Sequence, residues 1–282
     1  MKVSEIMTEN PIVAEVPGTR TDVLKLLAKE NITGVPVVRA TDRKLVGFVT
    51  RQDIFMRPEE EQLAMIMRRD YPALLPDSDV IDAATHILEY NVAHLPVVEN
   101  DKLVGIITPT DLLIVVEKNE DPTPVEQIAR STCNPIYEGA PLVVALATFK
   151  VAKVNSLPVL DDEAKLSGII TDRDIFNQSI VDGAVVMSEL GLTGGANNWT
   201  WTGLRNVMKL WYEVSKIDLP KLSVREVMVK NPMTVFNKTP AFEAARIMRK
   251  NDFGQLPLRD SRDNLIGMIY DTDVISTMVK SD

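Results

Sequence analysis

The chain has 282 residues, 45% of them hydrophobic and 25% charged, with a formal net charge of -9 at pH 7. These fractions predict a folded globular protein, and the acidic charge disfavours general binding to nucleic acid or anionic membranes, which requires clustered Lys and Arg. The sequence has no stretch of about 18 apolar residues and no signal-peptide core, and Cys133 is its single cysteine, so we expect a reduced cytoplasmic protein without a membrane span.

A short apolar phrase around a proline occurs four times along the chain. The four prolines are Pro36, Pro96, Pro158 and Pro257. Nine to eleven residues after each proline comes a glycine inside a second apolar run, namely Gly47, Gly105, Gly168 and Gly267. The chain therefore consists of four repeats of one unit.

Each unit is expected to fold in the order strand, helix, strand, strand, helix. In the first unit, residues 12–16 form an apolar stretch, and Val23, Leu26 and Leu27 follow at helical spacing. The runs around the proline and the glycine are short, rich in Val and Ile, and separated by turn-forming residues, as in a strand hairpin. Units of about 50 to 60 residues are small for independent stability, so we expect units one and two to pair, and units three and four.

The repeats set the expected domain boundaries. We place the four repeats at 1–57, 58–120, 121–178 and 223–282, with an insertion at 179–222. The insertion follows from the proline spacing, which is 99 residues between the last two prolines against 60 and 62 elsewhere.

A polar pair follows each glycine at the expected junction of strand and helix: Thr50 with Asp53, Thr108 with Asp111, Thr171 with Asp174, and Tyr270 with Asp273. A helix start suits a phosphate, and an aspartate one turn into the helix can accept hydrogen bonds from both ribose hydroxyls. Thr-x-x-Asp is equally a capping box, which contributes about 1 kcal/mol and explains any single copy. Capping does not explain the repeated glycine, where bare backbone permits close approach of a ligand or a neighbouring strand.

The ordered copies of apolar-Pro-apolar, Gly and Thr-x-x-Asp resemble the CBS repeats, whose pairs form Bateman modules, as in the gamma subunit of AMP-activated protein kinase and many archaeal proteins. The resemblance implies an α/β fold of four CBS repeats packed as two Bateman modules. It implies that each Thr and Asp contacts phosphate or ribose, and that the base lies between the first strand and the residues before the proline. Those positions are Ile12 and Val13 with Ile32 and Thr33, Ala73 with Val92 and Ala93, Ile136 with Val154 and Asn155, and Met233 with Phe253 and Gly254.

The third and fourth units differ in their expected phosphate chemistry. Arg173 stands between Thr171 and Asp174, and its guanidinium can hold phosphate oxygens in a bidentate manner, which makes the third unit the first candidate. The fourth unit has Tyr270 in place of threonine, with Asp273 retained for ribose. We expect it to be degenerate or to bind without phosphate.

The insertion contains all three tryptophans, Trp199, Trp201 and Trp211. Leu204, Val207, Met208, Trp211 and Val214 recur there at helical spacing. One interpretation is an amphipathic helix that covers the second module. The other is an exposed anchor for a partner, because tryptophan is enriched at binding hot spots.

These features predict a regulatory module that senses AMP, ADP or ATP and acts on a separate effector, as a monomer or homodimer. Two histidines and one cysteine give no nucleophilic pair or metal cluster, so neither catalysis nor a catalytic cofactor is expected. One alternative is a sensor of S-adenosylmethionine or another adenosyl ligand. A second is an adaptor that docks on an enzyme, a transporter or the ribosome through the tryptophan-containing insertion.

Overall fold

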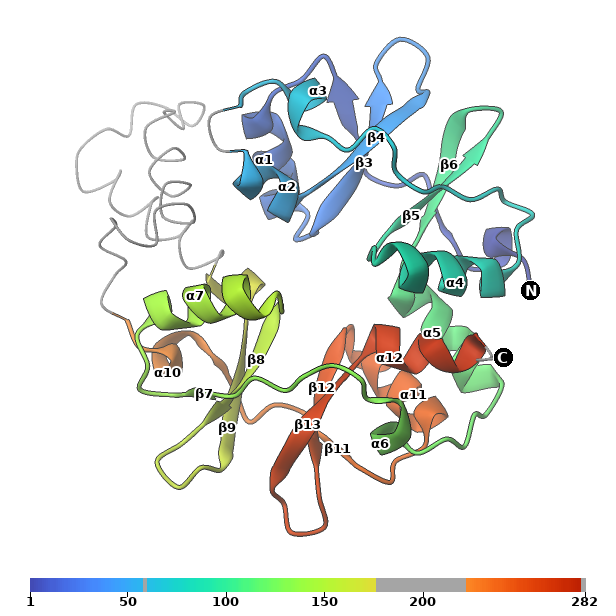
Figure 1. Cartoon of the computed structure of the whole chain (residues 1–282). Helices are drawn as coiled ribbons and strands as arrows, with labels where there is room; N and C mark the ends of the chain where they lie inside the picture. Colours follow the sequence, from blue (N-terminus) through green and yellow to red (C-terminus); the bar gives the residue numbers. More distant parts are fainter. Residues whose placement is uncertain (58–59, 176–221, 280–282) are drawn as a thin grey trace, which may run out of the picture. The chain divides into compact units, whose positions relative to one another are not determined.

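The computed structural model describes residues 1–57, 60–175 and 222–279, and within them one α/β design occurs four times (Figure 1). Two compact units emerge, each described by itself. One is built around the first, second and fourth repeats (Met1–Ile54, Glu60–Thr132, Met233–Asp282), and the other around the third (Phe55–Glu59, Cys133–Pro232).

The first repeat has the predicted element order: β2 (Ala14–Val16), α1 (Arg20–Lys29), β3 (Gly34–Arg39), β4 (Leu45–Thr50) and α2 (Arg51–Met56). Strand β2 runs parallel to β3, and β3 pairs antiparallel with β4. The start of β2, the start of β3 and the end of β4 therefore meet at one edge of the sheet.

The other repeats follow the same plan, although the first strand of the second repeat is reduced to the single bridge between Leu74 and Val97. Their elements are α4 (Val80–Tyr90), β5 (Leu95–Glu99), β6 (Lys102–Ile107) and α5 (Pro109–Lys118) in the second repeat; β7 (Ile136–Tyr137), α7 (Leu142–Ala152), β8 (Ser156–Leu160) and β9 (Leu166–Thr171) in the third; and β11 (Val235–Phe236), α11 (Ala241–Asn251), β12 (Gln255–Arg259), β13 (Leu265–Tyr270) and α12 (Asp271–Ile275) in the fourth.

Helix α4 shows how the local sequence determines where a helix begins, which face it buries and where it ends. The carboxylate of Asp79 accepts a hydrogen bond from the Ile81 backbone N–H at 2.9 Å and so begins the helix. Its buried side chains recur at three- and four-residue steps and form one apolar face. Asn91 ends it in the left-handed conformation, with φ of 49°, as asparagine tolerates.

The segment before each of the first two repeats packs on the other repeat. Strand β1 (Thr8–Glu9) leads the first repeat but pairs with β6 of the second. After α3 (Leu63–Ile66), which leads the second repeat, Arg68 bridges to Phe48 in β4 of the first. This exchange joins the first two repeats, as predicted.

The leading segments of the last two repeats are exchanged in the same way. Helix α6 (Val125–Ile128) leads the third repeat, and its Val125 N–H donates to the Thr239 carbonyl of the fourth at 2.9 Å. After α10 (Val224–Val227), β10 (Val229–Lys230) leads the fourth repeat but pairs with β9 of the third. The third and fourth repeats are therefore the second exchanging pair.

The repeated glycine lies where the exchanged segment passes closest. A Cβ atom would lie 2.6 Å from the Arg68 carbonyl oxygen at Gly47, and 2.4 Å from a methionine sulfur at Gly105 and at Gly168. At Gly267 the nearest atom would be Leu258 Cδ1 at 3.6 Å, an ordinary contact. A neighbouring chain segment, rather than a ligand, therefore explains three of the four glycines.

The second and fourth repeats share one hydrophobic core, which the sequence did not indicate. Helices α5, α11 and α12 lie side by side (Figure 1), and buried residues of both repeats form a single cluster. At its border, Glu117 pairs with Arg246 at 3.1 Å and with Arg249 at 2.7 Å.

No helix among the described residues is long and apolar enough to cross a membrane. The insertion expected at 179–222, with Trp199, Trp201 and Trp211, lies outside the described residues apart from Leu222.

The close approach at Gly47 predicts a difference between two otherwise similar substitutions. Gly47→Ala should lower the free energy of unfolding by about 1–3 kcal/mol, because the Arg68 backbone oxygen has to move away. Gly267→Ala should be neutral or stabilising by up to about 1 kcal/mol, because its methyl group has room. Urea unfolding measures both, and equal losses would contradict this account of the repeated glycine.

Candidate functional site

In the first three repeats, a threonine and an aspartate form the same capping arrangement at the start of the last helix. The Thr50 hydroxyl and backbone N–H both donate to Asp53 Oδ2, at 2.6 and 2.9 Å. The corresponding distances are 2.8 and 2.7 Å for Thr108 with Asp111, and 2.6 and 2.8 Å for Thr171 with Asp174. The predicted capping bonds are formed, and in each case they use one carboxylate oxygen.

The helix start also contacts the predicted wall of the site. The Arg51 N–H donates to the Thr33 carbonyl at 2.9 Å, and Asp172 and Asp271 donate likewise to Asn155 at 3.0 Å and to Gly254 at 2.9 Å. In the second repeat this position is Pro109, which has no N–H to offer Ala93. The residues before the proline phrase therefore lie beside the Thr–Asp pair.

The first-strand residues of the predicted sites lie at the same sheet edge. In the first repeat, Ala14 is in register with Val37, so Ile12 and Val13 come just before the paired part of β2, at the edge where β4 ends. Ile136 is in β7 and 7% exposed. Ala73 precedes the Leu74 bridge. The fold thus places three separate sequence segments of each predicted site at one edge.

The four repeats differ in whether the second oxygen of the aspartate, Oδ1, accepts a hydrogen bond. Asp53 Oδ1 accepts a hydrogen bond from Arg68 Nε at 2.8 Å, and Asp273 Oδ1 accepts one from the Arg130 N–H at 3.2 Å. For Asp111 and Asp174, no residue in the described part of the chain donates to Oδ1. Among the described residues, the second and third repeats therefore combine the capping bonds with a carboxylate oxygen to which no donor is bound.

Asp111 and Asp174 differ in their surroundings. Burial raises the pKa of Asp111, because desolvation disfavours its charged form. Arg173, one residue before Asp174, is partly exposed, and none of the described side chains forms an ion pair or hydrogen bond with it.

The fourth repeat has a second carboxylate, Asp271, two residues before Asp273, as the third repeat has Asp172 before Asp174. Burial, with a contribution from the nearby charge of Asp273, raises the pKa of Asp271 to about 7. Asp273 is 6% exposed, and the Tyr270 N–H donates to it at 3.0 Å. The wall residues Met233 and Phe253 are exposed.

A cluster between the first and second repeats was not predicted from the sequence. His94 Nε2 lies 3.1 Å from the Thr33 hydroxyl, and its ring centroid is 5.2 Å from that of Phe48. Phe48 stacks on Tyr71 at 4.4 Å, and Arg68 lies over the Tyr71 ring. The proline phrase marks Thr33 and His94 as neighbours of equivalent prolines, but their contact arises only from the pairing of the repeats.

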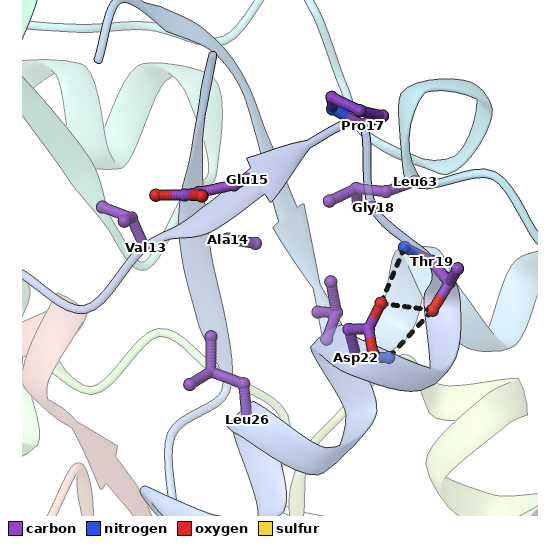
Figure 2. Close-up of a pocket in the computed structure, with 10 residues that line it drawn as sticks. Val13, Ala14, Glu15, Pro17, Gly18, Thr19, Asp22, Leu26 and Leu63 are labelled. Carbon is purple, nitrogen blue, oxygen red and sulfur yellow. Dashed lines mark hydrogen bonds between the residues drawn. The ribbon is translucent and has the colours of Figure 1, made fainter. Parts of the chain in front are cut away.

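A separate pocket of about 250 Å³ lies between β2 and α1 (Figure 2). Its apolar wall includes Leu26 and Leu63, and Thr19 and Asp22 line its rim with a capping pair of their own, at 2.6 Å. Of the residues predicted for the site of the first repeat, Val13 lines this pocket, whereas Thr50 and Asp53 do not.

These features define a protein built from four tandem α/β repeats that exchange their leading segments. The CBS domain family matches residues 3–60, 63–118, 125–180 and 224–280. The chain belongs to this family, and both the predicted fold class and the predicted repeats are confirmed.

Two solved structures that cover the whole chain have the same fold, and a further relative matches part of the chain in sequence. The Methanocaldococcus jannaschii protein MJ1225, described as a putative archaeal homolog of g-AMPK, superposes with a TM-score of 0.75 at 21% identity over 99% of this chain and 100% of its own. An uncharacterized conserved protein from Pyrococcus horikoshii gives 0.67 at 24% identity, over 99% and 100%. A CBS domain-containing protein of Dictyostelium discoideum is 30% identical over 55% of this chain and 91% of its own.

The burial of His94 predicts a pH-dependent stability. Burial lowers the pKa of His94 from 6.5 to about 4, so the unfolded chain binds more protons between these values and stability falls as the pH drops. From pH 7.5 to pH 5, the wild type should lose on the order of 2 kcal/mol relative to His94→Gln. The difference isolates the histidine, because Asp271 and the other acids are common to both proteins. Parallel stability curves from urea unfolding would contradict the prediction.

Proposed function

We propose that this protein is a regulatory sensor that binds AMP, ADP or ATP at its second and third repeats and acts on a separate effector. One observation carries the proposal: Asp111 and Asp174 each keep a carboxylate oxygen that no described residue uses. A ribose offers the donors that such an oxygen accepts.

The proposed contacts follow from the positions of the residues. In the third repeat, Asp174 would accept the ribose hydroxyls, Arg173 and the Thr171 hydroxyl would bind the phosphate, and Ile136, Val154 and Asn155 would enclose the base. In the second repeat, Thr108 and Asp111 would act in the same way, with Ala73, Val92 and Ala93 around the base. This second site has no arginine in the position of Arg173.

The first and fourth repeats are proposed to be weaker sites. Arg68 would have to leave Asp53 before a ribose could bind there, together with Thr50, Ile12, Val13, Ile32 and Thr33. The fourth repeat has Tyr270 in the position of Thr171 and Thr272 in the position of Arg173, so it favours a neutral or cationic adenosyl ligand such as S-adenosylmethionine over a nucleotide.

Regulation requires that the nucleotide bind two conformations with different affinity. Occupied sites would then shift the balance between these conformations, and the effector would recognise one of them.

Calorimetric titration of the full chain with AMP, ADP, ATP and S-adenosylmethionine tests the proposal. Two nucleotide sites per chain are expected. Asp174→Asn and Asp111→Asn should each weaken one of them by about 10- to 100-fold, because a hydrogen bond to a charged group contributes roughly 1.5–3 kcal/mol.

Asp22→Asn is the matched control, because the Thr19 hydroxyl donates to Asp22 at 2.6 Å in the same capping geometry, away from both proposed sites. It should leave both affinities unchanged. If no nucleotide binds, or if Asp22→Asn and Asp174→Asn have the same effect on binding, the sensor function is wrong and the Thr–Asp pairs are only caps.

A further inference from the structure

Each leading segment meets the repeat that receives it at the start of the first helix of that repeat. We call this contact a junction. At each of the four junctions the backbone N–H of the first helical residue donates to a carbonyl of the leading segment: Arg20 to Glu61 at 2.9 Å, Val80 to Met1 at 3.2 Å, Leu142 to Leu222 at 3.1 Å and Ala241 to Thr123 at 2.8 Å. Because these bonds are alike, the backbone does not distinguish a partner's segment from a repeat's own.

The first junction contains a buried ion pair where the other three have uncharged side chains. Arg20 is 3% exposed, and its Nη2 lies 2.8 Å from Glu61 Oε1. Within the described chain, Arg20 Nε and Nη1 and Glu61 Oε2 are buried without a hydrogen-bond partner. Such a pair is often no more stabilising than two apolar side chains, such as Leu142 and Leu222 at the third junction. The leading segment of the first repeat has Met1 at the position of Glu61, so on its own repeat it would leave Arg20 buried without a carboxylate.

The junctions of the third and fourth repeats carry charges at another pair of equivalent positions. The Arg225 N–H donates to the Glu138 carbonyl at 2.8 Å, and the Glu126 N–H donates to the Asn237 carbonyl at 3.1 Å. At the first of these junctions the Arg225 guanidinium pairs with the Glu138 carboxylate, and Glu138 is 7% exposed. At the second, Lys238 and the Asn237 side-chain amide both donate to the Glu126 carboxylate. Arg225 and Glu126 therefore occupy equivalent places with opposite charge.

Docking of either segment on its own repeat would bring like charges together. If the leading segment of the third repeat docked on the third repeat, Glu126 would take the place of Arg225 against the buried Glu138. If the leading segment of the fourth repeat docked on the fourth repeat, Arg225 would take the place of Glu126 beside Lys238. Each change replaces an attraction by a repulsion, which is how an interface excludes a wrong partner.

We propose that these charged residues determine which repeat receives each leading segment. The first repeat requires the carboxylate of Glu61, because Arg20 is buried. The third and fourth repeats reject the segments that precede them through Glu138 and Lys238. Stability is not the main contribution of these pairs, since Lys238 is 75% exposed and an exposed ion pair stabilises a fold little. The selectivity resides in residues far apart in the chain, and it is independent of nucleotide binding.

Cysteine pairs can record which repeat holds the leading segment of the fourth repeat. Ser223 faces Pro141 in an antiparallel bridge, and Pro240 is the equivalent residue of the fourth repeat. The hydrogen bonds of each bridge lie on the neighbouring residues, and in such pairs the Cα atoms are about 4.5 Å apart, within reach of a disulfide. In a Cys133→Ser background, Ser223→Cys with Pro141→Cys therefore records docking on the third repeat, and Ser223→Cys with Pro240→Cys records docking on the fourth.

Inverting both leading segments tests the proposal at constant net charge. Glu126→Arg with Arg225→Glu makes each segment complementary to its own repeat and repelled by its partner. The rate of 141–223 disulfide formation relative to that of 223–240, followed on non-reducing gels, should fall at least about tenfold. Adding Glu138→Arg with Lys238→Glu should restore the wild-type ratio, because the observed pairing is then complementary again.

Arg39→Asp with Asp42→Arg is the matched control, because this exposed pair, 2.9 Å apart, lies in the first repeat, which takes part in neither of these two junctions. It should leave the ratio unchanged. A wild-type ratio in the chain with both segments inverted, with its urea unfolding transition intact, would overturn the proposal. If that chain does not fold, the chain with all four charges inverted decides. Failure of the fourfold variant to fold, or to regain the wild-type ratio, would show that these residues do not act through their charge.

Discussion

The exchange of leading segments is the constraint on which the rest of this structure depends. A unit of about 60 residues buries only a modest fraction of its surface and is marginally stable by itself. Here each unit gains an additional strand or short helix from its partner repeat, and in the first three repeats that segment passes against the glycine of the hairpin. Because backbone passes against backbone at Gly47, a side chain larger than hydrogen would force the two segments apart.

The same exchanged segments determine the chemistry at the helix starts. Each exchanged segment crosses close to the Thr–Asp pair of the partner repeat. The residue at the crossing determines whether the second carboxylate oxygen of the aspartate accepts a hydrogen bond. Arg68 and the Arg130 backbone bind that oxygen in the first and fourth repeats. At the equivalent crossings of the second and third repeats stand Thr8 and Val229, which pair with the strand through their backbone as Arg68 does, but whose side chains donate no hydrogen bond to Asp111 or Asp174. The four similar motifs thus fall into two kinds, those with and those without a described donor to the second carboxylate oxygen.

Capping and ligand binding are consequently compatible in one residue. The cap uses Oδ2 of the aspartate and fixes the orientation of the carboxylate. A carboxylate held in this way presents its other oxygen without further loss of side-chain entropy, so a structural role prepares the group for recognition. The two interpretations of Thr-x-x-Asp that the sequence left open are therefore not exclusive at Asp111 and Asp174.

The sequence by itself determined the four repeats, the order of strands and helices, and the Thr–Asp pairs with their capping bonds, because apolar periodicity and capping act over fewer than about ten residues. The tertiary structure alone decided which carboxylate oxygens are occupied, why Gly47 is required, that His94 contacts Thr33, and that the second and fourth repeats share a core. Each of these depends on segments far apart in the chain, and local pattern does not specify which repeat receives a given leading segment. Arg68 could be recognised as basic from the sequence, but its partner Asp53 belongs to another repeat, and only the pairing of the repeats brings them to 2.8 Å.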